Sequence, residues 1–152
     1  ILALALAQQG RTEEALVEIE SAPDFALDHP FTRAVAALVS TVNGRPAEAL
    51  VHADAVTQST GVTYFDEVLA YLAAAGAAAQ LGDHEHAELS AEAAVARAMA
   101  VGDVVAFGLA TSAYVAITGK AHPAHDPRAQ LADGWANIVS RLHPSATPSV
   151  EA

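Results

Sequence analysis

The sequence predicts an all-α protein built from antiparallel helix hairpins, and three observations lead to this fold class. Ala-rich apolar runs alternate with Gly and Pro, a composition that favours closely packed helices. A Gly, followed by Ala five residues later, recurs at Gly10, Gly44 and Gly82, which are 34 and 38 residues apart. A period of this length is typical of helix-hairpin repeats. No segment of the sequence has the period-two alternation bounded by hairpin turns that a strand requires.

The first seven helices are placed by reading outward from these turns. Each Gly predicts a left-handed cap that ends one helix, and the small Ala after it lets the next helix approach closely. Pro suits a first helical turn, and Asp and Thr suit N-caps. These starts are predicted at Pro30, Pro46, Asp83 and Asp103, and at Thr63 with Asp66. The helices are expected at residues 1–9, 13–21, 31–42, 47–58, 64–81, 84–101 and 104–118.

After a weaker fourth turn at Gly119 the pattern is interrupted. Asp126 and Pro127 then predict the start of a last amphipathic helix. Its apolar stripe consists of Leu131, Trp135, Ile138, Val139 and Leu142. The sequence thus predicts one helical domain at residues 1–142 and a flexible tail rich in Pro, Ser and Thr at 143–152. Because the chain opens on Ile1 without Met, we expect it to be a fragment of a larger protein.

Composition excludes several classes of protein. With 152 residues, 53% of them hydrophobic and 16% charged, the chain has enough apolar surface for a core, which rules out intrinsic disorder. A net charge of -11 argues against nucleic acid and anionic membrane surfaces as partners. No apolar run is long enough to span a bilayer. With no Cys there is no disulfide and no Cys-based zinc site, so a cytoplasmic location is the expectation.

Catalytic and metal sites are not predicted. The sequence has no phosphate loop before Lys120 and no nucleophile-elbow or dinucleotide-binding motif, so we expect neither an enzyme nor a cofactor. The seven His residues raise a metal site as the alternative, with His84, Glu88, His122 and His125 as its candidate ligands. A solvated helix start and a polar loop explain these residues better, because no Cys or third clustered ligand accompanies them.

The repeat motifs resemble those of the tetratricopeptide repeat (TPR) family. That family carries small residues at three positions, matched here by Ala15, Ala49 and Ala87, by Ala3, Ala37 and Ala75, and by Ala22, Val56 and Ala94. The chain departs from it where large aromatic residues are usual, at Leu6, Ser40 and Ala78 and at Ile19, Ala53 and Ala91. The resemblance implies a right-handed solenoid of about three and a half to four repeats. The spacing of 38 residues is similar to that of long-repeat arrays in large bacterial signalling ATPases, regulators and cyclase-linked proteins.

The resemblance also implies a partner-binding groove lined by the first helix of each pair. Its inward positions here are Phe31, Leu38, Thr41, Leu69, Leu72, Leu109 and Ile117. Such a groove suits an apolar helix or peptide, supplied by the rest of the parent protein, by another protein or by a second copy in a homodimer. The alternative is that these residues pack against neighbouring repeats or against the last helix.

Three classes of function follow from the sequence. The first is a non-catalytic interaction scaffold or regulatory module within a larger bacterial signalling protein. The second is an array that senses a small-molecule or peptide effector and controls an attached ATPase, cyclase or transcription regulator. The third is a metal-dependent hydrolase. A scaffold predicts a groove that is open along its length, and a sensor predicts a closed apolar pocket. A hydrolase predicts titratable residues that converge.

Overall fold

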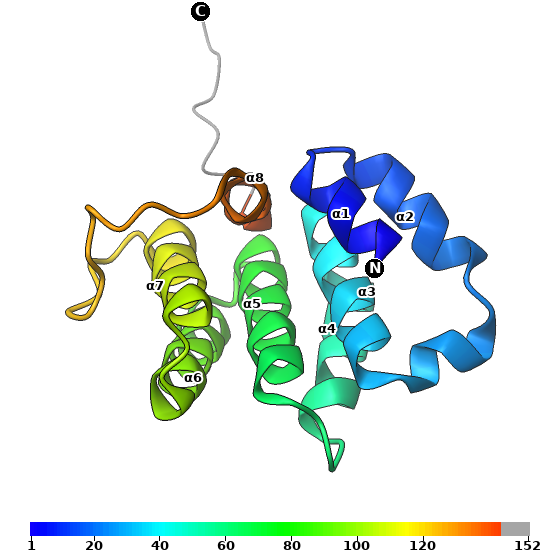
Figure 1. Ribbon diagram of the computed structural model, residues 1–152, viewed down its shortest axis with the longest axis horizontal. Coiled ribbons are helices and arrows are strands. Elements are labelled where there is room, and N and C mark those ends of the chain that lie inside the picture. Colours follow the sequence, from blue (N-terminus) through cyan, green and yellow to red (C-terminus); the bar gives the residue numbers. More distant parts are fainter. Residues whose placement is uncertain (144–152) are drawn as a thin grey trace, which may run out of the picture.

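The computed structural model describes residues 1–143 and is all-α over that range, as predicted (Figure 1). It contains no strand within those residues. The elements are α1 (Leu2–Gln8), α2 (Thr12–Ser21), the short 3₁₀ helix η1 (Asp24–Asp28), α3 (Pro30–Val42), α4 (Pro46–Thr57), α5 (Tyr64–Gln80), α6 (His84–Val101), α7 (Val104–Thr118) and α8 (Asp133–Leu142). None of these helices combines the length and the apolar character that a membrane crossing needs. The predicted tail lies outside the described residues except for His143.

Local signals set the helix boundaries as the sequence predicts. Gly10, Gly44 and Gly82 adopt φ of 77°, 69° and 78°, the left-handed region in which a residue with a Cβ is strained. Thr63 and Asp66 form a reciprocal capping box at the start of α5. The carboxylates of Asp83 and Asp103 likewise accept backbone N–H groups at the starts of α6 and α7, and Pro30 and Pro46 open α3 and α4.

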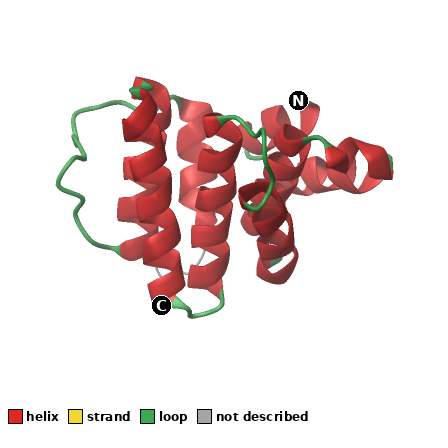
Figure 2. Ribbon diagram, turned by 90° about the horizontal axis from the view of Figure 1, so that it is seen from below, coloured by secondary structure: helices red, strands yellow, loops and turns green. Residues whose placement is uncertain are grey.

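The last helix begins later than predicted. Residues 119–132 form a loop without helix, visible at the left of Figure 2, and α8 starts at Asp133 rather than at Asp126. The Asp126 side chain accepts the N–H of Arg128, and its carbonyl accepts the N–H of Ala129. These bonds close a local turn, which competes with a helix start. Leu131, placed on the helical stripe by the sequence, therefore precedes α8, although it still packs against the core.

Helix α5 lies at the centre of the fold and contacts α3, α4, α6, α7 and α8. Its C-terminal half is almost entirely Ala, and these residues are buried. Side chains this small let the backbones of the surrounding helices come close, and they leave little volume between the helices. The closest approach is at Gly76, where a Cβ atom would lie 2.7 Å from the Leu142 carbonyl oxygen and 2.7 Å from Cγ2 of Thr41.

A pair of glycine substitutions tests this packing. Gly76→Ala should lower the free energy of unfolding by about 1–3 kcal/mol, because the added methyl group forces α8 and α3 away from α5. Gly108→Ala, in the middle of α7, should raise it by about 0.5–1 kcal/mol, because a Cβ at this position meets no atom within 4 Å and alanine favours helix. Urea unfolding of both variants measures the difference. Equal effects of the two substitutions would contradict the close approach at Gly76.

Candidate functional site

Helix α8 is seated across the odd-numbered helices of the chain. It contacts α1, α3, α5 and α7, and Figure 1 shows it lying over α5 between α1 and α7. We call the parts of these four helices that contact α8 the α8-binding face. The helix arrives there after the loop at residues 119–132, so its contacts join segments that are far apart in the sequence. The α8-binding face is thus a surface on which one amphipathic helix is already bound.

The apolar side of α8 provides its anchors. Ile138 and Leu142 are 1% and 0% exposed. The ring of Trp135 packs edge-on against Phe65 of α5, with 5.9 Å between the ring centroids. Burying one Ile or Leu side chain contributes about 1.5–3 kcal/mol. The predicted stripe of α8 is therefore the side that contacts the rest of the chain.

Two side-chain amides link α8 to the rest of the fold through carbonyl groups at helix ends. The Nε2 group of Gln80 donates to the carbonyl oxygens of Thr41 at 2.9 Å and Leu142 at 3.0 Å, which links α5 to the ends of α3 and α8. The Nδ2 group of Asn137 donates to the carbonyl oxygen of Gln8, the last residue of α1, at 2.8 Å. The last four carbonyls of a helix have no partner within that helix, and the two amides donate to one such carbonyl at the end of each of α1, α3 and α8. Such contacts recognise a helix end whatever its sequence.

The residues that form this contact, on α8 and on the α8-binding face, were only partly predicted. The stripe of α8 was found from its periodicity, whereas Gln80, Asn137 and Gly76 were not singled out. An isolated Gly within the Ala run of α5 is a signal of close backbone approach and could have drawn attention to Gly76. The two amides carry no such signal, because their partners are backbone atoms of distant segments.

The seven predicted groove residues lie mainly inside the helix layer. Leu38, Leu69, Leu72 and Leu109 are at most 1% exposed, and Ile117 is 6% exposed. Thr41 is 0% exposed as well, so six of the seven are buried by the same chain, and a partner reaches them only if a helix moves. Their role in binding stays a prediction.

The other two groove residues occupy different positions. The Thr41 hydroxyl donates to the carbonyl oxygen of Ala73 at 2.9 Å and so fastens α3 to α5. Phe31 is partly buried and packs at the edge of the core.

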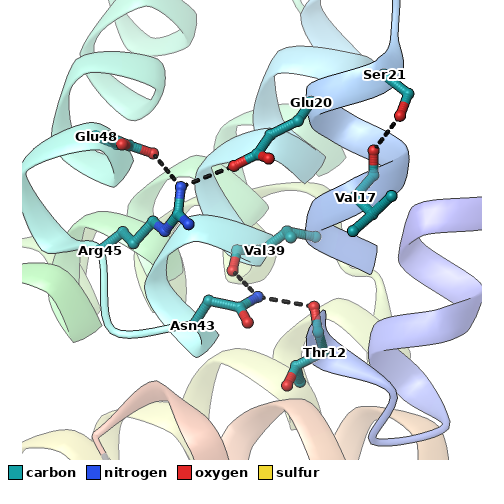
Figure 3. Close-up of polar contacts among 8 residues, drawn as sticks. All are labelled: Thr12, Val17, Glu20, Ser21, Val39, Asn43, Arg45 and Glu48. Atoms are coloured by element: carbon teal, nitrogen blue, oxygen red, sulfur yellow. Dashed lines mark hydrogen bonds and ion pairs between the residues drawn. The ribbon is translucent and has the colours of Figure 1, made fainter. Parts of the chain in front are cut away.

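Polar contacts at the junction of α2, α3 and α4 join neighbouring helices (Figure 3). Arg45 lies between Glu20 at 2.8 Å and Glu48 at 3.7 Å. Asn43 donates to the carbonyl oxygens of Thr12 at 2.9 Å and Val39 at 2.8 Å, which ties the end of α3 to the start of α2. The ion pairs are exposed and contribute little, so the partly buried hydrogen bonds of Asn43 contribute most among these polar contacts.

The four candidate metal ligands are not brought together in one group, although His84 and Glu88 line the same hollow. His84 is exposed at the start of α6, and the ring of His122 lies 3.1 Å from Glu92. The Nδ1 atom of His125 lies 3.3 Å from the Thr111 hydroxyl, and Glu88 is engaged by Lys120. Within residues 1–143, no group of three His, Cys, Asp or Glu side chains is arranged to hold a metal ion.

The cluster around Glu88 is not poised for proton transfer. Its hydrogen bond from Lys120 lowers the pKa of Glu88 and raises the pKa of Lys120. Burial raises the pKa of Tyr114, whose hydroxyl also reaches Glu88. These shifts favour the carboxylate, the ammonium ion and the neutral phenol near pH 7. A general base or acid instead needs a pKa close to the working pH.

His52 is the one described side chain with a buried polar atom that lacks a hydrogen-bond partner. Its Nδ1 atom has no partner among the described residues. Burial lowers the pKa of His52, and the nearby Arg33 lowers it further, while Glu48 opposes the shift. A histidine held neutral in this way can sense acid, because protonation puts a charge into a partly buried site.

Comparisons of the chain with protein-family models, with curated proteins and with solved structures give no match.

The pH dependence of stability tests His52. Because its pKa is lowered in the folded state, the unfolded state binds more protons, and the free energy of unfolding should fall as the pH drops below about 6.5. His52→Leu should reduce this loss between pH 7 and pH 5, as measured by urea unfolding at each pH. His84→Gln removes an exposed histidine and should leave the loss unchanged. A pH profile unaltered by His52→Leu would contradict the assignment.

Proposed function

We propose that this chain is a non-catalytic protein-interaction module that receives an amphipathic helix on its α8-binding face. One observation carries the proposal: an amphipathic helix from the same chain is seated there, across four other helices. Helix-in-groove recognition uses apolar anchors at helical spacing, and Trp135, Ile138 and Leu142 have that spacing. In this proposal α8 occupies the place that a partner helix takes.

We further propose that the seven preceding helices form a TPR-like solenoid of antiparallel hairpins with a right-handed superhelix. Left-handed glycines at the three turns and the order of contacts between consecutive helices support this arrangement. The repeat alanines Ala15, Ala49 and Ala87 are buried, at 0%, 0% and 3% exposure, as close helix packing requires. The module would belong to a larger bacterial signalling or regulatory protein, and the partner helix would come from that protein or from another.

The loop at residues 119–132, which connects α8 to α7, determines how strongly a partner must bind to displace α8. A helix held on a short flexible connection has an effective concentration of the order of millimolar at its own site. A partner at micromolar concentration therefore needs an affinity about a thousand times higher than the intrinsic affinity of α8 to displace half of it. Substitutions that weaken α8 alone should expose the face without altering it.

A competition experiment tests the proposal. The probe is a synthetic peptide of residues 133–142 with Trp135→Phe, added to the full chain, whose single Trp reports on α8. The Ile138→Ser chain lacks this buried anchor. Its α8 should bind the α8-binding face more weakly by over 1.4 kcal/mol, the free energy that corresponds to a tenfold change in affinity. The peptide should then bind at least tenfold more tightly than to the wild-type chain. Its binding should shift the Trp135 emission to longer wavelength as the indole leaves Phe65.

Ala136→Ser is the matched control, because it places the same side chain on the exposed side of α8. This variant should bind the peptide like the wild type. Equal peptide binding by both variants, or no binding by either, would contradict the proposal. Loss of helical circular dichroism across the whole Ile138→Ser chain would also contradict it, since α8 would then be an integral part of the core.

A further inference from the structure

Gly108 lies in the middle of α7, where the fold has no requirement for glycine. Its φ is not positive, and a Cβ atom added there would meet no atom within 4 Å. Glycine in a helix interior is less stable than alanine because it loses more backbone freedom on folding. Gly76 differs, because neighbouring atoms forbid a side chain there. The missing side chain at Gly108 instead leaves open space at the surface of α7.

That space is the floor of a hollow of 220 Å³ between α7, the loop at residues 119–132 and the start of α8. Val104, Val105, Leu131 and Trp135 form its apolar walls, and Thr111, Ser112 and His125 provide polar groups. A second hollow, of 240 Å³, is lined by Met99, Val104 and Phe107 among others. Because Val104 lines both hollows, they adjoin each other.

The surface around the two hollows is unusually apolar for exposed side chains. Val104 is 83% exposed, and Val105 and Met99 are each 59% exposed. Exposed apolar residues that cluster beside a depression are typical of interaction sites, whereas scattered ones are not. We call Met99, Val104, Val105, Phe107, Gly108 and Trp135 the α7 strip.

The size of the hollows selects the kind of ligand. Sites for drug-sized molecules and cofactors occupy about 300–1,000 Å³, and each of the two hollows is smaller. One apolar side chain is a better match for each. Two hollows that share Val104 as a wall suit two anchors one helical turn apart, which lie about 5–6 Å from each other.

Charge selects the partner. No Lys or Arg lines either hollow, while Asp103 lines the second one. The hydrogen bond from the Tyr64 hydroxyl, together with backbone N–H groups of α7, lowers the pKa of Asp103, so it stays a carboxylate at neutral pH. A second copy of this chain would carry another net charge of -11 and would be repelled. A cationic partner is attracted.

We propose that the α7 strip docks a basic amphipathic helix of a partner protein, with one apolar side chain seated over Gly108 and a second beside Met99. This site goes beyond the proposed function, because α8 keeps its place on the α8-binding face and its Trp135 forms one wall of the site. Apolar anchors supply the affinity, and the negative chain selects Lys and Arg on the partner's polar side.

The test uses a fluorescein-labelled synthetic helix of about 15 residues, with two Leu four positions apart, Lys at the polar positions and Ala elsewhere. Fluorescence anisotropy measures its binding to the full chain. A second peptide, with Glu at every Lys position, should bind at least tenfold more weakly. Equal binding of the two peptides, or no binding of the Lys peptide, would overturn the proposal.

Matched variants locate the binding site. Gly108→Leu fills the first hollow, meets no neighbouring atom at its Cβ and should weaken the Lys peptide at least tenfold, whereas Gly108→Ala should stay within threefold of the wild type. Val104→Ser should weaken binding, and Val51→Ser, at a valine of α4 that is 66% exposed, should not. Wild-type affinity in Gly108→Leu, or equal losses in the two valine variants, would overturn the α7 strip as the site.

The same variants distinguish this inference from the proposed function. Gly108→Leu should leave the exchange of the α8 peptide in the Ile138→Ser chain unchanged, because that exchange takes place on the α8-binding face. If the α8 competition fails while the Lys peptide still binds, the proposed function is contradicted and the α7 strip stands. If the competition succeeds while the Lys peptide does not bind, only the α7 strip is contradicted.

Discussion

Close approach of backbones around α5 is the constraint on which the rest of the structure depends. A helix with larger side chains in its C-terminal half would hold α3 and α8 farther away, and one amide at Gln80 would no longer span the ends of both. The position of α8 therefore follows from the alanines and the glycine of α5. Since Ala and Gly have no side-chain rotamers to lose, this packing avoids the side-chain entropy cost that larger core residues bring.

In the two proposals, the α8-binding face and the α7 strip recognise a helix by different physical means. The α8-binding face combines a deep apolar contact with amides that engage helix-end carbonyls, which most helices can offer. The α7 strip is shallower, and its selectivity comes from hollows the size of one side chain, from Asp103 beside the second hollow and from the net negative charge of the chain. The α8-binding face therefore selects a helix by where it ends, whereas the α7 strip selects it by its charge.

The sequence predicted the features that depend on neighbouring residues. Left-handed glycines, N-caps and the period of the turns act over a few positions, and the structure places Gly10, Gly44, Gly82, Thr63 and Asp103 as expected. The predicted start of the last helix was wrong, because a local turn at Asp126 competes with helix formation. The contacts of Gln80 and Asn137 could not be predicted, since their acceptors are carbonyls brought near only by the tertiary fold.

The loop at residues 119–132 has a consequence for how this architecture can vary. The entropy of closing a flexible loop grows with the logarithm of its length, so doubling the loop weakens the seating of α8 by only about 0.6 kcal/mol. Insertions in this loop should therefore destabilise the contact of α8 only slightly, as long as they spare Leu131, which packs against the core. The length of this connection is therefore free to vary, whereas a change of size at the buried anchors Ile138 and Leu142 requires a compensating change in the face beneath them.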